Sequence, residues 1–280
     1  MKDKQKKDDF PDAVEKVNAL LCEGDSVRKS GADVIREVPF AVRLNGRHMA
    51  TLACAGIHLR ELAIGHLYAE GWIGDRNDIE SIRVTKSSAT VRTRQGTETG
   101  GTAESHRPAP LIGSSGARMR SGRKPKLAGA ESDAPVISPG KVSALMRALL
   151  ASTVLHEATR GTHCSGIADR DRLLASREDI GRHNTLDMLA GLSVLGGLDL
   201  SDKILLTTGR ISSEMVSKAA GMGISFIISH SAPTSEAVAS AARKGMTLAC
   251  SVRGKKTRVY AHGKRIAGVR PGRAKRRTNK

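Results

Sequence analysis

Cysteine and aromatic residues are both scarce in this chain of 280 residues: there are four cysteines, and aromatic residues make up 2%. The cysteines lie far apart, and no pair has the spacing of a zinc site or a redox motif. This pattern excludes a disulfide-built secreted domain and a zinc ribbon, and it favours a cytoplasmic location. The H-x-E or C-x-E and P-C-x-x-C motifs of zinc deaminases are missing too, so we predict no metal site.

Long apolar runs are also lacking. No stretch reaches the length needed to cross a bilayer, and the charged segment Met1–Asp9 is not followed by the apolar stretch of a secretory signal. We therefore expect no membrane span. Hydrophobic residues make up 39% of the chain, which is slightly lean for a globular domain and predicts that part of the chain is unpacked.

Positive charge is what the chain has in excess. Lysine and arginine number 46 against 28 acidic residues, giving a formal net charge of +18. Residues 263–280 hold eight of these bases and no acid, which predicts a disordered basic tail. The tail is either an electrostatic handle for a nucleic acid or a solubilising extension. It has no aromatic residue on which a base would stack, which favours the second reading.

Composition divides the rest of the chain into four further segments. Residues 94–136 are rich in Gly, Ser, Thr, Ala, Pro and Arg, and they predict a flexible loop. The predicted segments around it are a mobile N-terminal segment (1–32), a β-rich portion (33–93) and an α/β portion (137–262). We therefore expect two structured portions separated by one long loop.

In the β-rich portion, Asn45-Gly46 is typical of a two-residue hairpin turn. Apolar residues recurring at helical spacing after Leu59 predict an amphipathic helix that ends near Gly71. The predicted strands are 38–44, 47–53, 79–85 and 89–93.

In the α/β portion, short apolar strands alternate with helices, which predicts a mixed or parallel sheet covered on both faces. The predicted helices are 142–154, 184–195, 213–221 and 234–244, and the predicted strands are 203–207, 224–229, 246–252 and an edge strand at 258–262. In such folds, ligand sites lie where strands end in polar turns.

Three polar segments follow this rule: residues 159–164, 178–184 and 207–214. In the second, Arg182 and His183 open a helix, whose free N–H groups favour an anion. The alternative is a plain helix start with a surface arginine above a packed histidine. The third, with Gly209, Arg210 and Ser213, suits phosphate or ribose, and its alternative is simple capping by serine.

Cys164 is the one cysteine with a histidine beside it, His163. A neighbouring imidazole lowers the pKa of a thiol and makes it nucleophilic. The alternative, which we favour, is a small buried residue, since free cysteine is among the most buried residue types.

At these segments the sequence resembles the formate dehydrogenase accessory protein family, the FdhD/NarQ sulfurtransferases. The likeness runs from about residue 33 to 262, and its most specific runs are EDIGRHNTLD, GRISSEMVSKAA and SAPTSEAV. It implies a cytidine-deaminase-like fold, a homodimer, and transfer of sulfur from a cysteine desulfurase to the bis-guanine-dinucleotide form of the molybdenum cofactor, which activates formate dehydrogenase. By this resemblance, the cofactor-binding residues are His163, Arg182, His183, Asn184, Gly209, Arg210, Ser213, Ser251, Val252, Arg253, Gly254, Lys255 and Lys256.

The chain departs from the family at its sulfur-carrying C-G-x-C-G motif. The first cysteine position falls on Gly116 and the second on Arg118 or Met119, and no cysteine lies between Cys54 and Cys164. A persulfide needs a thiolate, so the loop chemistry cannot run here. We rank cofactor binding without loop-borne sulfur first. Use of Cys164 and a decaying or repurposed gene stay open as the other two readings. Whether the protein is an enzyme stays open, and a basic nucleic-acid-binding protein is the alternative function.

Overall fold

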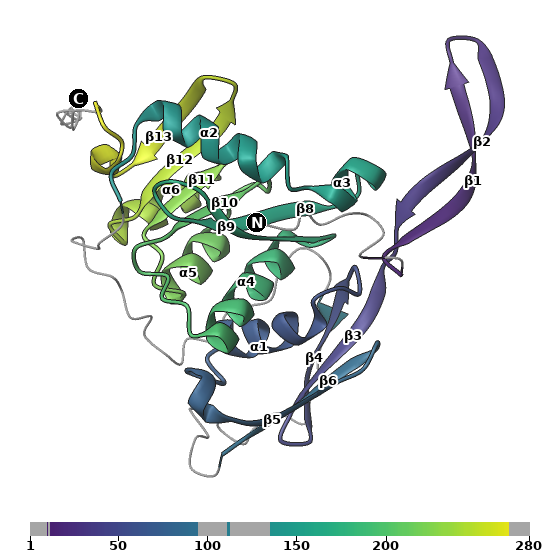
Figure 1. Cartoon of the computed structure of the whole chain (residues 1–280), viewed down its shortest axis with the longest axis horizontal. Coiled ribbons are helices and arrows are strands. Elements are labelled where there is room, and N and C mark those ends of the chain that lie inside the picture. The colour runs from purple at the N-terminus through teal and green to yellow at the C-terminus, as the bar shows by residue number, and fades with distance from the viewer. Residues whose placement is uncertain (1–9, 11, 95–110, 113–134, 269–280) are drawn as a thin grey trace, which may run out of the picture.

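A computed structural model describes residues 10, 12–94, 111–112 and 135–268 (Figure 1). The strands are β1 (Val14–Glu23), β2 (Ser26–Ile35), β3 (Val38–Leu44), β4 (Arg47–Cys54), β5 (Ile79–Val84), β6 (Ser88–Thr93), β7 (Leu111–Ile112), β8 (His163–Ala168), β9 (Leu173–Asp179), β10 (Ile204–Thr207), β11 (Phe226–Ser229), β12 (Thr247–Arg253) and β13 (Lys256–Ala261). The helices are α1 (Leu59–Ala69), α2 (Pro139–Leu150), α3 (Val154–Thr159), α4 (Arg182–Gly196), α5 (Ser213–Gly221) and α6 (Ser235–Arg243), with short 3₁₀ turns η2 (Arg76–Asp78) and η3 (Gly263–Arg265).

The C-terminal portion is a six-stranded mixed sheet in the order β13-β12-β11-β10-β8-β9. Strands β10, β11 and β12 are parallel, and β8, β9 and β13 each run antiparallel to a neighbour. Successive side chains of a strand point to opposite faces. Leu205 and Ile227 accordingly pack with α4, α5 and α6, whereas Leu206 and Ile228 pack with α2. The predicted mixed sheet with helices on both faces is confirmed (Figure 1).

The N-terminal portion is a second sheet, in the order β5-β6-β3-β4-β7, with α1 packed on it. The predicted turn at Asn45-Gly46 joins β3 to β4, and both residues have positive φ, as this turn requires. The two portions meet where α1 crosses α4 (Figure 1). At this crossing a Cβ atom built on Gly65 would lie 1.6 Å from the main-chain oxygen of Asp187, so the two helix backbones are in direct contact.

The structure corrects the expectation of a mobile segment over residues 1–32. Strands β1 and β2 pair antiparallel over residues 14–35 and form a hairpin that extends away from the rest of the protein (Figure 1). The Gly24-Asp25 turn between two alternating runs is a hairpin signal that the sequence analysis passed over. Residues 1–9 and 11 lie outside the described residues.

A second correction concerns the single helix predicted over 142–154, which is two helices, α2 and α3. The hydroxyls of Ser152 and Thr153 each donate to a carbonyl three residues back, at 2.7 Å. These bonds satisfy the last carbonyls of α2 and compete with continuation of the helix.

Further corrections concern strands and the tail. Residues 163–164 and 178–179, which we assigned to polar segments without regular structure, belong to β8 and β9. The basic tail begins inside the fold, because Arg265 and Ile266 are buried and Ile137 pairs with Ile266. Residues 269–280 and almost all of the predicted loop 94–136 lie outside the described residues.

Candidate functional site

The polar ends of β10, β11 and β12 meet the beginning of β8 at one edge of the large sheet. Cys164 and Thr208 hold this edge together: Cys164 N–H donates to Thr208 Oγ1 at 2.9 Å, and Thr208 N–H donates to the carbonyl oxygen of Cys164 at 2.8 Å. The hydroxyls of Ser229 and Ser231 donate to the carbonyl oxygens of Gly209 and Thr208, each at 2.8 Å. These bonds order the loops at the carboxyl ends of the parallel strands, where α/β folds bind ligands.

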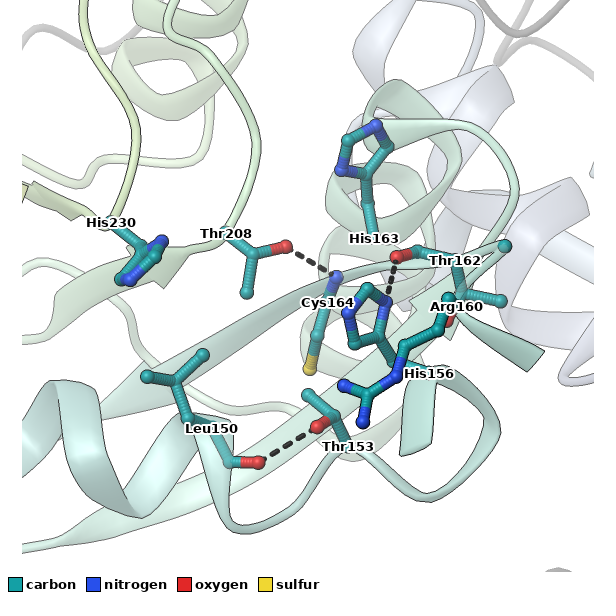
Figure 2. A pocket seen from close by; sticks show the side chains of 10 residues that line it. Leu150, Thr153, His156, Arg160, Thr162, His163, Cys164, Thr208 and His230 are labelled. Atoms are coloured by element: carbon teal, nitrogen blue, oxygen red, sulfur yellow. Dashed lines mark hydrogen bonds between the residues drawn. The ribbon is translucent and has the colours of Figure 1, made fainter. Parts of the chain in front are cut away.

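A pocket of about 370 Å³ opens at this edge (Figure 2). This volume lies at the lower end of the range for small-molecule sites. The lining residues are Leu150, Thr153, His156, Arg160, Gly161, Thr162, His163, Cys164, Thr208 and His230.

Beside the pocket, two arginines lie at the beginnings of neighbouring helices. Arg182 is the first residue of α4 and packs over Gly209, where an added Cβ would lie 3.0 Å from the Arg182 Cβ. Its buried Nε has no hydrogen-bond partner in the described part of the chain. Burial, followed by the charge of nearby Arg210, lowers the pKa of Arg182. Two guanidinium groups therefore face a region where two helix N-termini also favour an anion.

The two predicted site histidines are held neutral. Burial lowers the pKa of His163, and the charge of Arg182 adds to this effect. Burial also lowers the pKa of His183 to about 4, with Lys218 contributing next. His183 is 4% exposed, and neither ring nitrogen has a hydrogen-bond partner among the described residues, although Glu214 Oε2 lies 3.7 Å from Nε2.

Asn184 is bound within the protein. Its amide nitrogen donates to the carbonyl oxygen of Ala53 at 2.8 Å and to Asp179 Oδ1 at 2.7 Å. Asp179 also accepts the N–H groups of Ala55 and Gly181, each at 2.9 Å. Asn184 and Asp179 thus fasten the beginning of α4 to the end of β4, and the Asn184 amide group is already engaged there.

Ser213 follows the residue that caps α5: the Ser212 side chain accepts the Met215 N–H at 3.4 Å, and Ser213 itself is half-buried. The capping alternative therefore applies to Ser212.

The predicted segment 251–256 lies at the same edge of the sheet. Ser251 has positive φ, and Val252 is 2% exposed, which places its side chain in the core. Arg253 lies close enough to His230 for its charge to lower the pKa of that histidine, after burial. Gly254, Lys255 and Lys256 are exposed at the turn into β13.

The four cysteines differ in exposure: three are buried and one is exposed. Burial raises the pKa of Cys164, which is 1% exposed, and raises the pKa values of Cys54 and Cys250 to about 12. Cys22, on the β1–β2 hairpin, is exposed. Gly116 lies outside the described residues, as do Arg118 and Met119.

No group of three or more His, Cys, Asp or Glu side chains among the described residues is arranged to hold a metal ion. No helix in the same part of the chain is long and apolar enough to cross a membrane.

Sequence reasoning missed His156 and His230 as site residues, and it gave Glu178, within the segment 178–184, no role of its own. His230 directly follows β11, so the strand-end rule would have identified it. His156 carries no motif, and the segment 178–184 gave Glu178 no partner. The fold brings the two together, because Glu178 accepts the main-chain N–H groups of Leu155 and His156 at 2.9 and 2.8 Å.

Comparison with known proteins gives consistent results. The sequence model of the FdhD/NarQ family matches residues 35–267. The sulfur carrier protein FdhD of Bacillus pumilus (strain SAFR-032) is 36% identical over 236 residues, covering 84% of this chain and 90% of the relative. The sulfur carrier protein FdhD of Bacillus subtilis (strain 168) is 35% identical over 237 residues, covering 83% and 90%.

Among solved structures, a candidate formate dehydrogenase accessory protein from Desulfotalea psychrophila superposes with a TM-score of 0.73 at 24% identity. The superposition covers 91% of this chain and 99% of that protein, and it shows that the two share a fold. The specific likeness to a cytidine deaminase stays a prediction.

Proposed function

The chain belongs to the FdhD/NarQ family, and on that premise we propose that it is a formate dehydrogenase accessory protein. Its client is the bis-guanine-dinucleotide form of the molybdenum cofactor, which it binds through the guanine nucleotide parts. It does so without carrying sulfur on the family's loop. A cysteine desulfurase as partner, a homodimer and a cytoplasmic location belong to the same proposal.

The proposal of nucleotide binding rests on Arg182 and Arg210, which lie near each other at the beginnings of α4 and α5. Two like charges at short range destabilise each other unless an anion lies near them. The Glu214 carboxylate offsets only part of this repulsion, because the pKa of Arg182 stays lowered. A diphosphate supplies that anion, and the adjoining pocket offers room for a base. The unpartnered Arg182 Nε also fits a ligand of this class, because a buried donor is normally hydrogen-bonded.

The argument against sulfur transfer rests on the thiols. Sulfur carriage needs an accessible thiolate. The family's loop positions hold glycine, arginine or methionine, and Cys164 is 1% exposed. Cys164 lines the pocket, yet its pKa is raised by burial, followed by the charge of Glu178. We therefore propose that it is a packing residue.

Isothermal titration calorimetry with GDP tests the binding proposal. Arg210→Ala removes an exposed charge from the site and should weaken GDP binding about tenfold, as expected for one charge-assisted hydrogen bond. Arg243→Ala is the matched control, because Arg243 is exposed at the far end of α6 and pairs with Glu236. GDP affinity that is absent, or equal in both variants, would contradict the proposal.

Sulfur carriage is tested separately by intact-mass spectrometry after incubation with a cysteine desulfurase and cysteine. We expect no added sulfur on Cys164, so the adduct profiles of the wild type and Cys164→Ala should agree. An adduct present in the wild type and lost in Cys164→Ala would refute this part of the proposal. The variant Cys22→Ser controls for adventitious persulfide on the exposed thiol.

Nothing in the relatives named above supports the nucleic-acid alternative. Its basis is the basic tail, of which residues 269–280 lie outside the described part of the chain. Truncation after residue 268 keeps the buried Arg265 and Ile266 and should leave GDP binding unchanged. RNA binding by the truncated chain, together with no affinity for GDP, would favour the alternative.

A further inference from the structure

Three hydroxyl groups lie next to one another in the core between the large sheet and α4, and we call them the hydroxyl chain. Ser165 Oγ on β8 lies 2.7 Å from Thr185 Oγ1 on α4 and 2.9 Å from Thr207 Oγ1 on β10. All three residues are 0% exposed. Burial of a hydroxyl group is costly unless it is hydrogen-bonded, so these groups depend on one another and on the main chain.

Each end of the hydroxyl chain is bonded to a segment that carries one of the site arginines. At one end, the Thr185 hydroxyl donates to the carbonyl oxygen of Arg182 at 2.7 Å. At the other end, Thr207 Oγ1 accepts the N–H of Gly209 at 3.1 Å, and Gly209 directly precedes Arg210. The middle hydroxyl therefore connects the two arginine-bearing segments.

The two segments touch at Gly209. Its carbonyl oxygen accepts the Ser229 hydroxyl at 2.8 Å, so its position is fixed through both its N–H and its carbonyl group. The Arg182 side chain packs on this residue: a Cβ atom built on Gly209 would lie 3.0 Å from Arg182 Cβ and 3.2 Å from Arg182 Cδ. The direction of the Arg182 side chain thus depends on where Gly209 lies.

A contribution to stability does not by itself account for three buried hydroxyls. When both partners of a buried hydrogen bond are replaced by apolar groups of the same shape, the change in stability is often small. Hydrogen bonds also fix the relative positions of the groups that they join, and a satisfied buried network specifies one arrangement of a core. The hydroxyl chain joins α4 to β10 through β8, so it fixes how the two arginine-bearing segments lie relative to each other.

We propose that Ser165 is a positioning residue for anion binding, whose hydroxyl holds the segments of Arg182 and Arg210 so that both guanidinium groups reach the same diphosphate. The inference rests on the nucleotide binding proposed above. Ser165 is fully buried in the core, so its hydroxyl does not reach a ligand. Its effect on binding must act through the two arginines, and this dependence separates positioning from a general contribution to stability.

A double-variant cycle, measured by calorimetric titration of the full chain with GDP, tests this dependence. The four proteins are the wild type, Ser165→Ala, Arg210→Ala and the double variant. We expect Ser165→Ala to bind GDP about five- to tenfold more weakly than the wild type. Arg210→Ala should weaken binding about tenfold in the wild type and at most about threefold in the Ser165→Ala background, because a displaced guanidinium contributes less.

Thr247→Val is the matched control for loss of a buried strand hydroxyl. Thr247 is 0% exposed at the beginning of β12, the end of that strand away from the site, and its hydroxyl donates to the carbonyl oxygen of His262 at 2.6 Å. This variant should unfold at a lower urea concentration than the wild type, yet keep its GDP affinity and the tenfold effect of Arg210→Ala. A change in either would show that lost stability weakens binding, and it would overturn the inference.

Thr185→Val supplies a second route if Ser165→Ala does not fold, because it removes the bond to the Arg182 carbonyl and keeps a branched side chain. It takes the place of Ser165→Ala in the same cycle, with the same expected results. Unchanged GDP affinity in the variant, or a full tenfold effect of Arg210→Ala in its background, would overturn the inference and leave the proposed function intact. Absence of GDP binding by the wild type would overturn both.

Discussion

The crossing of α1 and α4 makes a sharp prediction about a single methyl group. A Cβ atom on Gly191 would lie 1.9 Å from the main-chain oxygen of Glu61, and real Cβ atoms essentially never approach closer than 3.0 Å. Gly191→Ala must therefore push two packed helix backbones apart. We expect this variant to be strongly destabilised.

The size of the loss in stability depends on the contacts that are disturbed when α1 and α4 move apart. Overpacking a close contact typically costs about 1–3 kcal/mol. The same crossing carries the two-point ion pair between Glu61 and Arg177, with N–O distances of 2.5 and 2.7 Å, and separation of the helices strains it. Alanine raises helix propensity by about 1 kcal/mol, which offsets part of this. With overpacking at the upper end of its range and the propensity gain subtracted, we expect a net loss of about 2 kcal/mol in the free energy of unfolding.

Equilibrium urea unfolding measures this loss, followed by circular dichroism and by the fluorescence of Trp72, the single tryptophan. Gly196→Ala is the matched control on the same helix, because nothing lies within 4 Å of its added Cβ and its φ is not positive. It should be neutral or more stable by up to about 1 kcal/mol. If both variants unfold at the same urea concentration, the backbone contact between α1 and α4 is refuted.

Three further predictions concern buried groups. Cys22 alone should react quickly with a thiol reagent in the native protein, and all four cysteines should react in denaturant; fast native labelling of a second thiol would contradict the burial of the others. Lys218→Met should lower the free energy of unfolding by about 3–5 kcal/mol, because Asp187 is then a buried charge without its partner at 2.5 Å. The double variant Lys218→Met with Asp187→Leu should regain most of that free energy in urea unfolding. His183, with its pKa lowered to about 4, stays neutral when folded and binds a proton more readily when unfolded, so its contribution to stability is complete above about pH 6.5 and is lost as pH falls towards 4. Acidification from pH 7 to pH 5 should therefore destabilise the wild type by about 2 kcal/mol more than His183→Leu, and equal pH dependence of the two would refute the neutral buried ring.

Local patterns were sufficient for much of the fold. The Asn45-Gly46 turn, the amphipathic spacing of α1 and the alternation of β10, α5, β11, α6 and β12 depend on neighbours a few residues apart, so the sequence displays them directly. Strands β8 and β9 were not predicted, because their Ser, Gly and Arg residues interrupt the alternation of apolar and polar residues that marks a strand. They are strands because β10 supplies an edge on which β8 pairs.

In the candidate site, too, local patterns predicted some residues, and contacts between distant residues decided the roles of others. The positions of Arg182, Gly209 and Arg210 at helix beginnings followed from turn and capping patterns, and the structure brings these residues together. The role of Asn184 did not follow, because its amide partner Ala53 is 131 residues away. His156 was hidden for the same reason, since its main-chain N–H donates to Glu178, 22 residues further along the chain and on another element.

The sequence by itself determined the family, the absence of cysteine between Cys54 and Cys164 and the residue types available at the sheet edge, because these are properties of the chain in order. Only the tertiary structure decided which side chains are free to meet a ligand. In the structure, Asn184 and Asp179 hydrogen-bond the two portions to each other, and the Cys164 thiol is buried. Arg182 Nε and His156 Nε2 have no hydrogen-bond partner among the described residues. The physical reason is that burial and hydrogen bonding depend on distances between residues far apart in the chain, which no local pattern encodes.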